Sequence, residues 1–146
     1  MVTLTTAIET KIHTNPDETT VEVPASAEIG DYVTIKPGAI IGEYVTIGEG
    51  STIADGANLG KATTIGANTE IHAGVTTGHA VSIGNMVRIG RGSTLDDSTK
   101  VGDKVEIGPD VTIEHHVRIA ICVSIPGYWI IPARFIVNPG LVLVKP

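Results

Sequence analysis

The sequence predicts an all-β fold in which the chain winds into stacked triangular coils of short strands. From Val21 onward the 146-residue chain divides into 21 hexads without an insertion, and the third residue of each hexad is Ile, Leu or Val except at Thr77. Residues 1 and 3 of an extended hexad point to the same side and residue 2 to the other. The next three residues are rich in Gly, Asp, Asn and Pro, which favour turns. Three hexads therefore form one coil, and 21 hexads form seven.

The composition agrees with such a narrow core and excludes several classes of function. Only five residues are aromatic, so Ile, Val and Leu must fill the axis. The net charge of -6 argues against a nucleic-acid or anionic-membrane surface. A single cysteine, Cys122, excludes an internal disulfide framework. The N-terminus shows no basic region followed by an apolar block and no apolar run long enough for a membrane helix, so we expect a cytoplasmic protein.

The two ends of the chain depart from the repeat. Residues 1–20 lie outside the hexad register, and we expect them to cap the repeat domain of residues 21–146, because the end of a solenoid exposes core and backbone. The last coil carries Ile130, Ile136 and Val142 at the outward second position, where earlier coils have mostly polar residues. This apolar coil predicts either an end-on contact or burial by the N-terminal segment.

Residues eighteen apart should lie above one another, so each hexad position forms vertical columns along the prism. Two columns consist of glycine, one beginning Gly30, Gly48 and the other Gly38, Gly56. We expect both to mark corners with a backbone conformation that glycine adopts at low cost.

A column of ionisable residues occupies the fifth position at one corner. It comprises Glu43, Lys61, His79, Asp97 and His115, and neighbouring members should be roughly 5 Å apart. His79 then lies between a cation and a carboxylate. An adjacent carboxylate can orient an imidazole as a general base. The alternative is a solvated ladder of alternating charge.

The repeat resembles the hexapeptide-repeat family, whose fold is the left-handed parallel β-helix; the left-handed winding is implied by that resemblance. The string VTTGHAVSIGN, which contains His79, resembles the catalytic hexads of acyltransferases in this family. This implies that His79 is the general base, Asp97 its orienting acid, and acetyl-CoA or another acyl thioester the co-substrate. It also implies a homotrimer with the active site between two rods. The acceptor-binding domain or long loop of those enzymes has no counterpart in these hexads.

A second enzyme class of the family, the γ-carbonic anhydrases, binds zinc through three histidines at a subunit interface. His72 resembles the first ligand of that class and His79 is at the fifth position, but the stacked partner of His72 is absent. His115 and His116, together with Glu114, are further ligand candidates. A regular rod without loops is also compatible with a non-catalytic assembly subunit. The acyltransferase is the favoured interpretation, and zinc enters only under the alternative.

Overall fold

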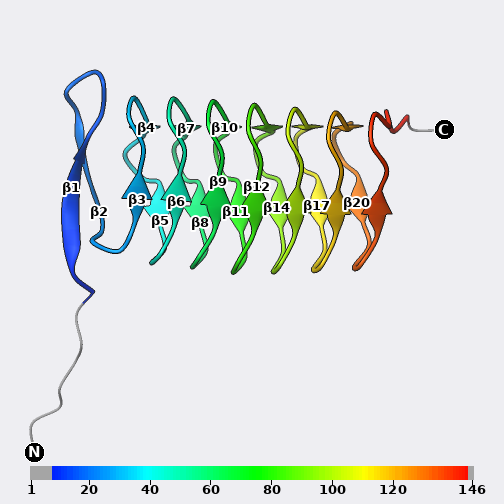
Figure 1. Ribbon diagram of the computed structural model, residues 1–146, viewed down its shortest axis with the longest axis horizontal. Helices are drawn as coiled ribbons and strands as arrows, with labels where there is room; N and C mark the ends of the chain where they lie inside the picture. Colours follow the sequence, from blue (N-terminus) through cyan, green and yellow to red (C-terminus); the bar gives the residue numbers. More distant parts are fainter. Residues whose placement is uncertain (1–7, 145–146) are drawn as a thin grey trace, which may run out of the picture.

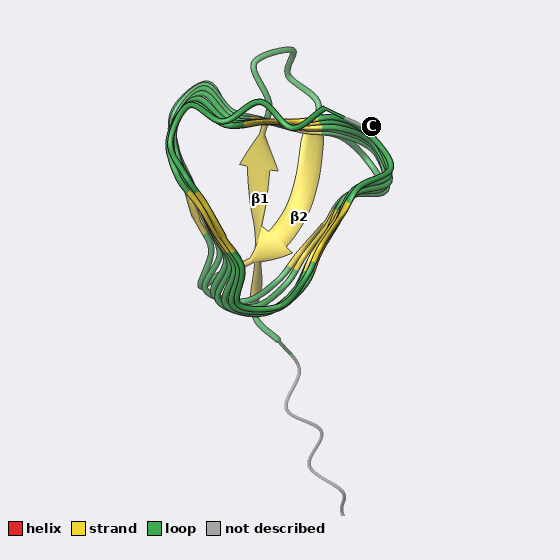
Figure 2. Ribbon diagram, turned by 90° about the vertical axis from the view of Figure 1, so that its right-hand side faces the viewer, coloured by secondary structure: helices red, strands yellow, loops and turns green. Residues whose placement is uncertain are grey.

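The structure is a computed structural model that describes residues 8–144. These residues form a rod of stacked coils with a β-hairpin at its N-terminal end (Figure 1). The hairpin consists of β1 (Thr10–Thr14) and β2 (Thr20–Pro24). Three parallel sheets form the sides of the rod, which is triangular in cross-section (Figure 2).

Each sheet takes one strand from every coil. Sheet I contains β3 (Glu28–Ile29), β6 (Thr46–Ile47), β9 (Thr64–Ile65), β12 (Ser82–Ile83), β15 (Lys100–Val101), β18 (Arg118–Ile119) and β21 (Ile136–Val137). Sheet II contains β4 (Thr34–Ile35), β7 (Thr52–Ile53), β10 (Glu70–Ile71), β13 (Arg88–Ile89), β16 (Glu106–Ile107) and β19 (Ser124–Ile125). Sheet III contains β5 (Ile40–Ile41), β8 (Asn58–Leu59), β11 (Thr76–Thr77), β14 (Thr94–Leu95), β17 (Thr112–Ile113) and β20 (Ile130–Ile131).

The strands pair in the predicted register of eighteen residues. Glu70 pairs with Arg88, for example, and Ile71 with Ile89. The sheets of seven, six and six strands make about six turns, one fewer than predicted. The difference arises at the ends, because β2 takes the first hexad into the hairpin and the last hexad contributes only an isolated bridge between Ser124 and Val142.

Side chains at the first and third hexad positions fill the axis of the rod. Ile53, Leu59 and Ile65 are among those with 1% exposure or less. Thr77, the one exception in the aliphatic column, is also buried, at 3% exposure. Its hydroxyl accepts the N–H of Gly60 at 3.0 Å and lies 3.2 Å from the hydroxyl of Thr63. Hydrogen bonding thus satisfies the polar group in the core.

The corners explain the two glycine columns differently. The column of Gly38 and Gly56 has positive φ, +89° and +70°, as predicted. The explanation predicted for the column of Gly30 and Gly48 is wrong, because these residues do not adopt positive φ. A Cβ on Gly48 would instead lie 2.5 Å from the carbonyl carbon of Gly66 in the next coil. Close approach of backbones therefore requires glycine in this column.

The described part of segment 1–20 lies across the N-terminal opening of the rod (Figure 2). The side-chain amide of Asn15, which is 3% exposed, accepts the N–H of Ile35 at 2.7 Å and donates to its carbonyl at 2.8 Å. A ring nitrogen of His13 lies 2.9 Å from the carbonyl oxygen of Val33. Side chains of the hairpin thus satisfy backbone groups of the first coil that would otherwise remain unpaired.

The C-terminal end is built differently. Ala120 at the fourth hexad position donates its N–H to the carbonyl of Val137 in the next coil. Pro126 and Pro132 take this position in the next two hexads and carry no N–H. Ile130 and Ile136 are more than 60% exposed. The described N-terminal segment does not bury them, because it lies at the opposite end (Figure 1).

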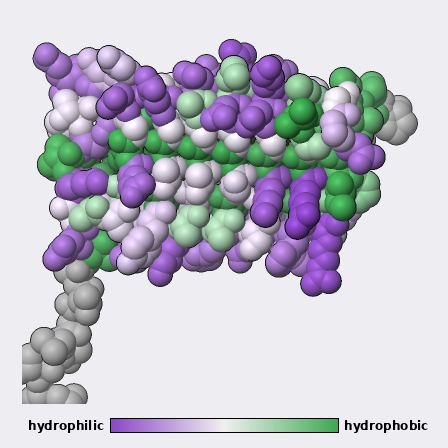
Figure 3. Space-filling view, viewed as in Figure 1, coloured by the Kyte–Doolittle hydropathy of each residue, from purple (hydrophilic) through white to green (hydrophobic). Residues whose placement is uncertain are grey.

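Polar side chains form rows along the rod in Figure 3, with a hydrophobic band between them and more hydrophobic groups near the C-terminal end. Residues 8–144 contain no helix that is long and apolar enough to cross a membrane.

Candidate functional site at one corner of the rod

His79 lies at the corner where the chain passes from β11 in sheet III to β12 in sheet I. Its side chain is exposed, whereas its backbone is bonded to the next coil. The N–H donates to Oδ1 of Asp97 at 2.7 Å, and the carbonyl accepts the N–H of Ser98 at 2.9 Å. The structure therefore presents an accessible imidazole on a rigid backbone, which suits a general base.

The predicted column of ionisable residues is present at this corner. At this corner the carbonyl of each column member accepts a backbone N–H from the next coil. The donor and acceptor pairs are Ala62 and Glu43, Ala80 and Lys61, Ser98 and His79, His116 and Asp97, and Arg134 and His115. The ammonium group of Lys61 lies 5.6 Å from the ring centroid of Tyr44, in the cation–π range.

The Asp97 carboxylate accepts a hydrogen bond from the backbone N–H of His79. None of the hydrogen bonds described for residues 8–144 joins this carboxylate to the His79 imidazole. Two other side chains accept a backbone N–H in this way at another corner: Oδ1 of Asn85 accepts the N–H of Ala67, and Oδ1 of Asp103 accepts the N–H of Asn85, both at 2.8 Å. This is a recurrent way of satisfying a corner N–H group. Asp97 thus holds the turn that carries His79.

Gly78 is a site residue that the sequence analysis missed. A Cβ at this position would lie 2.2 Å from Oδ1 of Asp97, so only glycine leaves room for the carboxylate to reach the His79 N–H. The sequence signal is glycine at the fourth position with Asp or Asn at the fifth position one coil later, a combination that only some fourth-position glycines show. The same pairing occurs at Gly66 with Asn85.

His115 and His116 occupy the same corner two coils closer to the C-terminus, between β17 and β18. Their Nδ1 atoms are 3.0 Å apart, and their rings are perpendicular with centroids 5.2 Å apart. Oε2 of the neighbouring Glu114 accepts the N–H of Ala133 at 2.9 Å.

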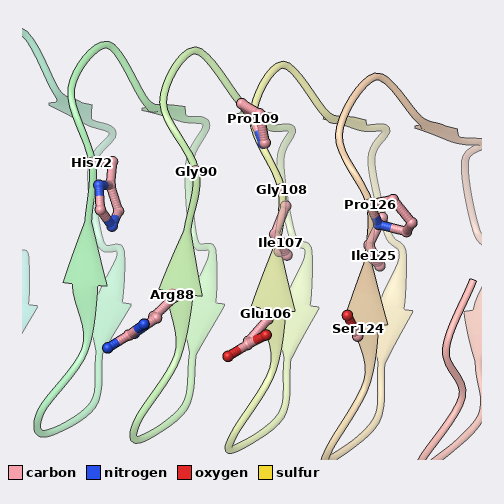
Figure 4. A pocket seen from close by; sticks show the side chains of 10 residues that line it. All are labelled: His72, Arg88, Gly90, Glu106, Ile107, Gly108, Pro109, Ser124, Ile125 and Pro126. Carbon is pink, nitrogen blue, oxygen red and sulfur yellow. The ribbon is translucent and has the colours of Figure 1, made fainter.

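His72 lies away from this corner, after β10 in sheet II. Oε2 of Glu70 is 3.5 Å from Nε2 of His72 and 3.4 Å from Nε of Arg88, and these side chains are about half exposed. Such a surface network contributes little stability. An open groove of about 390 Å³ runs from His72 past Arg88, Glu106 and Ser124 on successive coils (Figure 4).

Among residues 8–144 the structure places His115 beside His116, but it does not bring three of the candidate zinc ligands together. His72 and His79 follow strands of different sheets. Among the residues from 8 to 144, no three His, Cys, Asp or Glu side chains form a group that could hold a metal ion.

Comparison with known proteins finds one family match and several similar solved structures. Residues 26–61 match the family described as "Bacterial transferase hexapeptide (six repeats)". No curated protein matches the chain by sequence.

Among solved structures, the acetyltransferase domain of PglB from Neisseria gonorrhoeae is similar at a TM-score of 0.64 and 18% identity, covering 82% of this chain and 52% of that one. The same domain in complex with acetyl coenzyme A has a TM-score of 0.63 and 20% identity, covering 80% of this chain and 53% of that one. PerB from Caulobacter crescentus, in complex with CoA and GDP-perosamine, has a TM-score of 0.62 and 19% identity, covering 80% of this chain and 50% of that one. The chain thus spans about half the length of each of these proteins. The chain therefore has the predicted left-handed parallel β-helix fold, which it shares with these solved acetyltransferase structures.

Proposed function

We propose that the chain is an acyltransferase that moves an acetyl or other acyl group from a thioester to a hydroxyl or amine acceptor. The observation that carries the proposal is the exposed imidazole of His79 on a corner fixed by two backbone hydrogen bonds. The complexes of similar structures with acetyl coenzyme A and CoA support a CoA thioester as donor. Two further similar structures are of variants of the Caulobacter enzyme in which one histidine is replaced by Ala or Asn.

In this mechanism His79 accepts the proton of the acceptor O–H or N–H as that atom attacks the thioester carbonyl carbon. Backbone N–H groups stabilise the oxyanion that forms. The intermediate collapses with cleavage of the carbon–sulfur bond, and the imidazolium returns the proton to the departing thiolate. The products are the acylated acceptor and the free thiol, and His79 is regenerated.

We further propose that the active enzyme is a cytoplasmic homotrimer. An exposed corner offers little enclosure for a small molecule. A neighbouring rod placed beside the His79 corner would supply the second wall of the site and exclude water from the reacting groups.

Donor binding is the direct test. At about a hundredfold excess over its Kd, acetyl-CoA should stabilise the native protein by about 2.7 kcal/mol. This corresponds to a rise in Tm of about 5–10 °C in differential scanning fluorimetry. Zn²⁺ serves as the parallel arm. A shift with Zn²⁺ and none with CoA or acetyl-CoA would favour the carbonic anhydrase interpretation, and no shift with any of them would favour a scaffold.

Asp97 acts in this proposal as a positioning residue, through the backbone of His79. Asp97→Ala removes the acceptor of the His79 N–H and should lower kcat with little change in KM, because the turn that aims the imidazole loosens. Asp97→Asn keeps an oxygen acceptor, as Asn85 does for Ala67, and should restore kcat. Steady-state kinetics of the two variants make the comparison. Equal loss in both would show that the carboxylate charge acts on the imidazole itself.

A further inference from the structure

His115 and His116 form a histidine pair for which the proposed acyl transfer has no use. Both side chains are exposed. Their Nδ1 atoms are 3.0 Å apart, so one Nδ1–H donates to the lone pair of the other nitrogen. The pair lies two coils from His79 along the same corner, since His79 stacks under Asp97 and Asp97 under His115. It is a separate group of ligand atoms.

The backbone holds both histidines from two sides. The N–H of His116 donates to the carbonyl of Asp97 in one neighbouring coil, and the carbonyl of His115 accepts the N–H of Arg134 in the other, both at 3.0 Å. His116 has a φ of +59°, and non-glycine residues at the sixth position of other hexads also have positive φ, such as Ser98 at +58° and Cys122 at +57°. The two imidazoles therefore project from a rigid corner, which lowers the entropy lost when both bind one ion.

The chemistry of the two nitrogens favours a class of metal. Imidazole nitrogens bind first-row metals at about 2.0–2.1 Å. Two such ligands at a right angle are then about 3.0 Å apart, whereas at a tetrahedral angle they are about 3.4 Å apart. The distance in the structure is 3.0 Å. This is a hydrogen-bond distance, so the rings must turn before both lone pairs face one ion, and the choice of metal rests on the stronger binding of Cu²⁺ than of Ni²⁺ or Zn²⁺ by nitrogen ligands.

We propose that His115 and His116 form a two-nitrogen binding site for Cu²⁺ or Ni²⁺, independent of acyl transfer. Binding breaks the hydrogen bond between the two Nδ1 atoms, and the rings turn so that both lone pairs face the metal. The ring that donated this bond changes tautomer and bears its proton on Nε2, so each Nδ1 presents a lone pair and no net proton is released. Water fills the remaining coordination positions. The neighbouring carboxylates of Asp97 and Glu114 favour a cation here, and the guanidinium of Arg134 opposes it.

The test is a Cu²⁺ titration of the full chain without an affinity tag, followed by isothermal calorimetry and electron paramagnetic resonance. We expect one tight Cu²⁺ per chain, with hyperfine splitting from two imidazole nitrogens. His115→Ala and His116→Ala should each weaken binding by about tenfold or more, because one imidazole is left to hold the ion. His72→Ala is the matched control, since it removes another exposed histidine from a different sheet, and should leave the affinity unchanged.

The competing metals provide the second arm. Ni²⁺ should bind more weakly than Cu²⁺, and Zn²⁺ should fail to displace Cu²⁺ at equal concentration. Two results would overturn the proposal: Cu²⁺ affinity that survives the His115→Ala/His116→Ala double substitution, or Zn²⁺ binding tighter than Cu²⁺ to the unaltered chain. Because both side chains are exposed, the variants should keep the circular dichroism spectrum of the parent, and a change there is read separately from metal affinity.

Discussion

His79→Ala is expected to lower kcat for acyl transfer by about 10²- to 10⁴-fold, the contribution of a positioned general base. Without the imidazole, the acceptor must attack while still carrying its proton. The fold should not change, because the side chain is exposed and the backbone keeps its bonds to Asp97 and Ser98. Single-turnover transfer from acetyl-CoA to a panel of hydroxyl and amine acceptors, measured with the urea unfolding midpoint, checks both expectations.

His72→Ala is the control for this experiment, because it also removes an exposed imidazole but from sheet II. It should retain the activity and stability of the parent. Wild-type transfer by His79→Ala would show that another group is the base. Equal loss in both variants would point to a general effect of surface charge instead of a site at this corner.

The spacing of the repeat predicts most of the fold. A period of eighteen determines which residues pair, and it correctly predicts the parallel register that places Glu70 beside Arg88. It also correctly predicts that Lys61, His79 and Asp97 stack at one corner. These features depend on repetition, in which every coil supplies the same evidence. The left-handed winding does not follow from spacing and came from the resemblance.

Features that occur once are harder to predict. Nothing in the hexad pattern indicates that Asn15 satisfies both backbone groups of Ile35, because that contact joins a segment outside the repeat to the first coil. Spacing likewise placed Asp97 beside His79 but did not reveal that its oxygen bonds to the backbone N–H. The column arrangement predicts which residues are neighbours, whereas the site depends on which atoms of those neighbours meet.

Gly60 is expected to be the residue of the His79 corner that tolerates substitution least. A Cβ there would lie 2.2 Å from the carbonyl oxygen and 2.6 Å from the carbonyl carbon of Gly78. These are backbone atoms, so relief requires the two coils to separate. Gly60→Ala should then weaken the hydrogen bonds from its N–H to Thr77 and lower the free energy of unfolding by about 3 kcal/mol. Urea denaturation measures this loss.

Gly56→Ala is the matched control, because it adds the same methyl group at a corner with open space. Its Cβ would have a nearest neighbour at 3.8 Å, and the cost comes from a φ of +70°, about 1 kcal/mol. Ala62 and Ala80 already tolerate such a φ in this chain. Because Gly60 lies directly under Gly78, Gly60→Ala should also reduce acyl transfer under conditions where the protein remains folded, and Gly56→Ala should not. A loss for Gly60→Ala no larger than that for Gly56→Ala would show that the two coils accommodate the added Cβ, because Gly60 has no positive φ to add strain of its own.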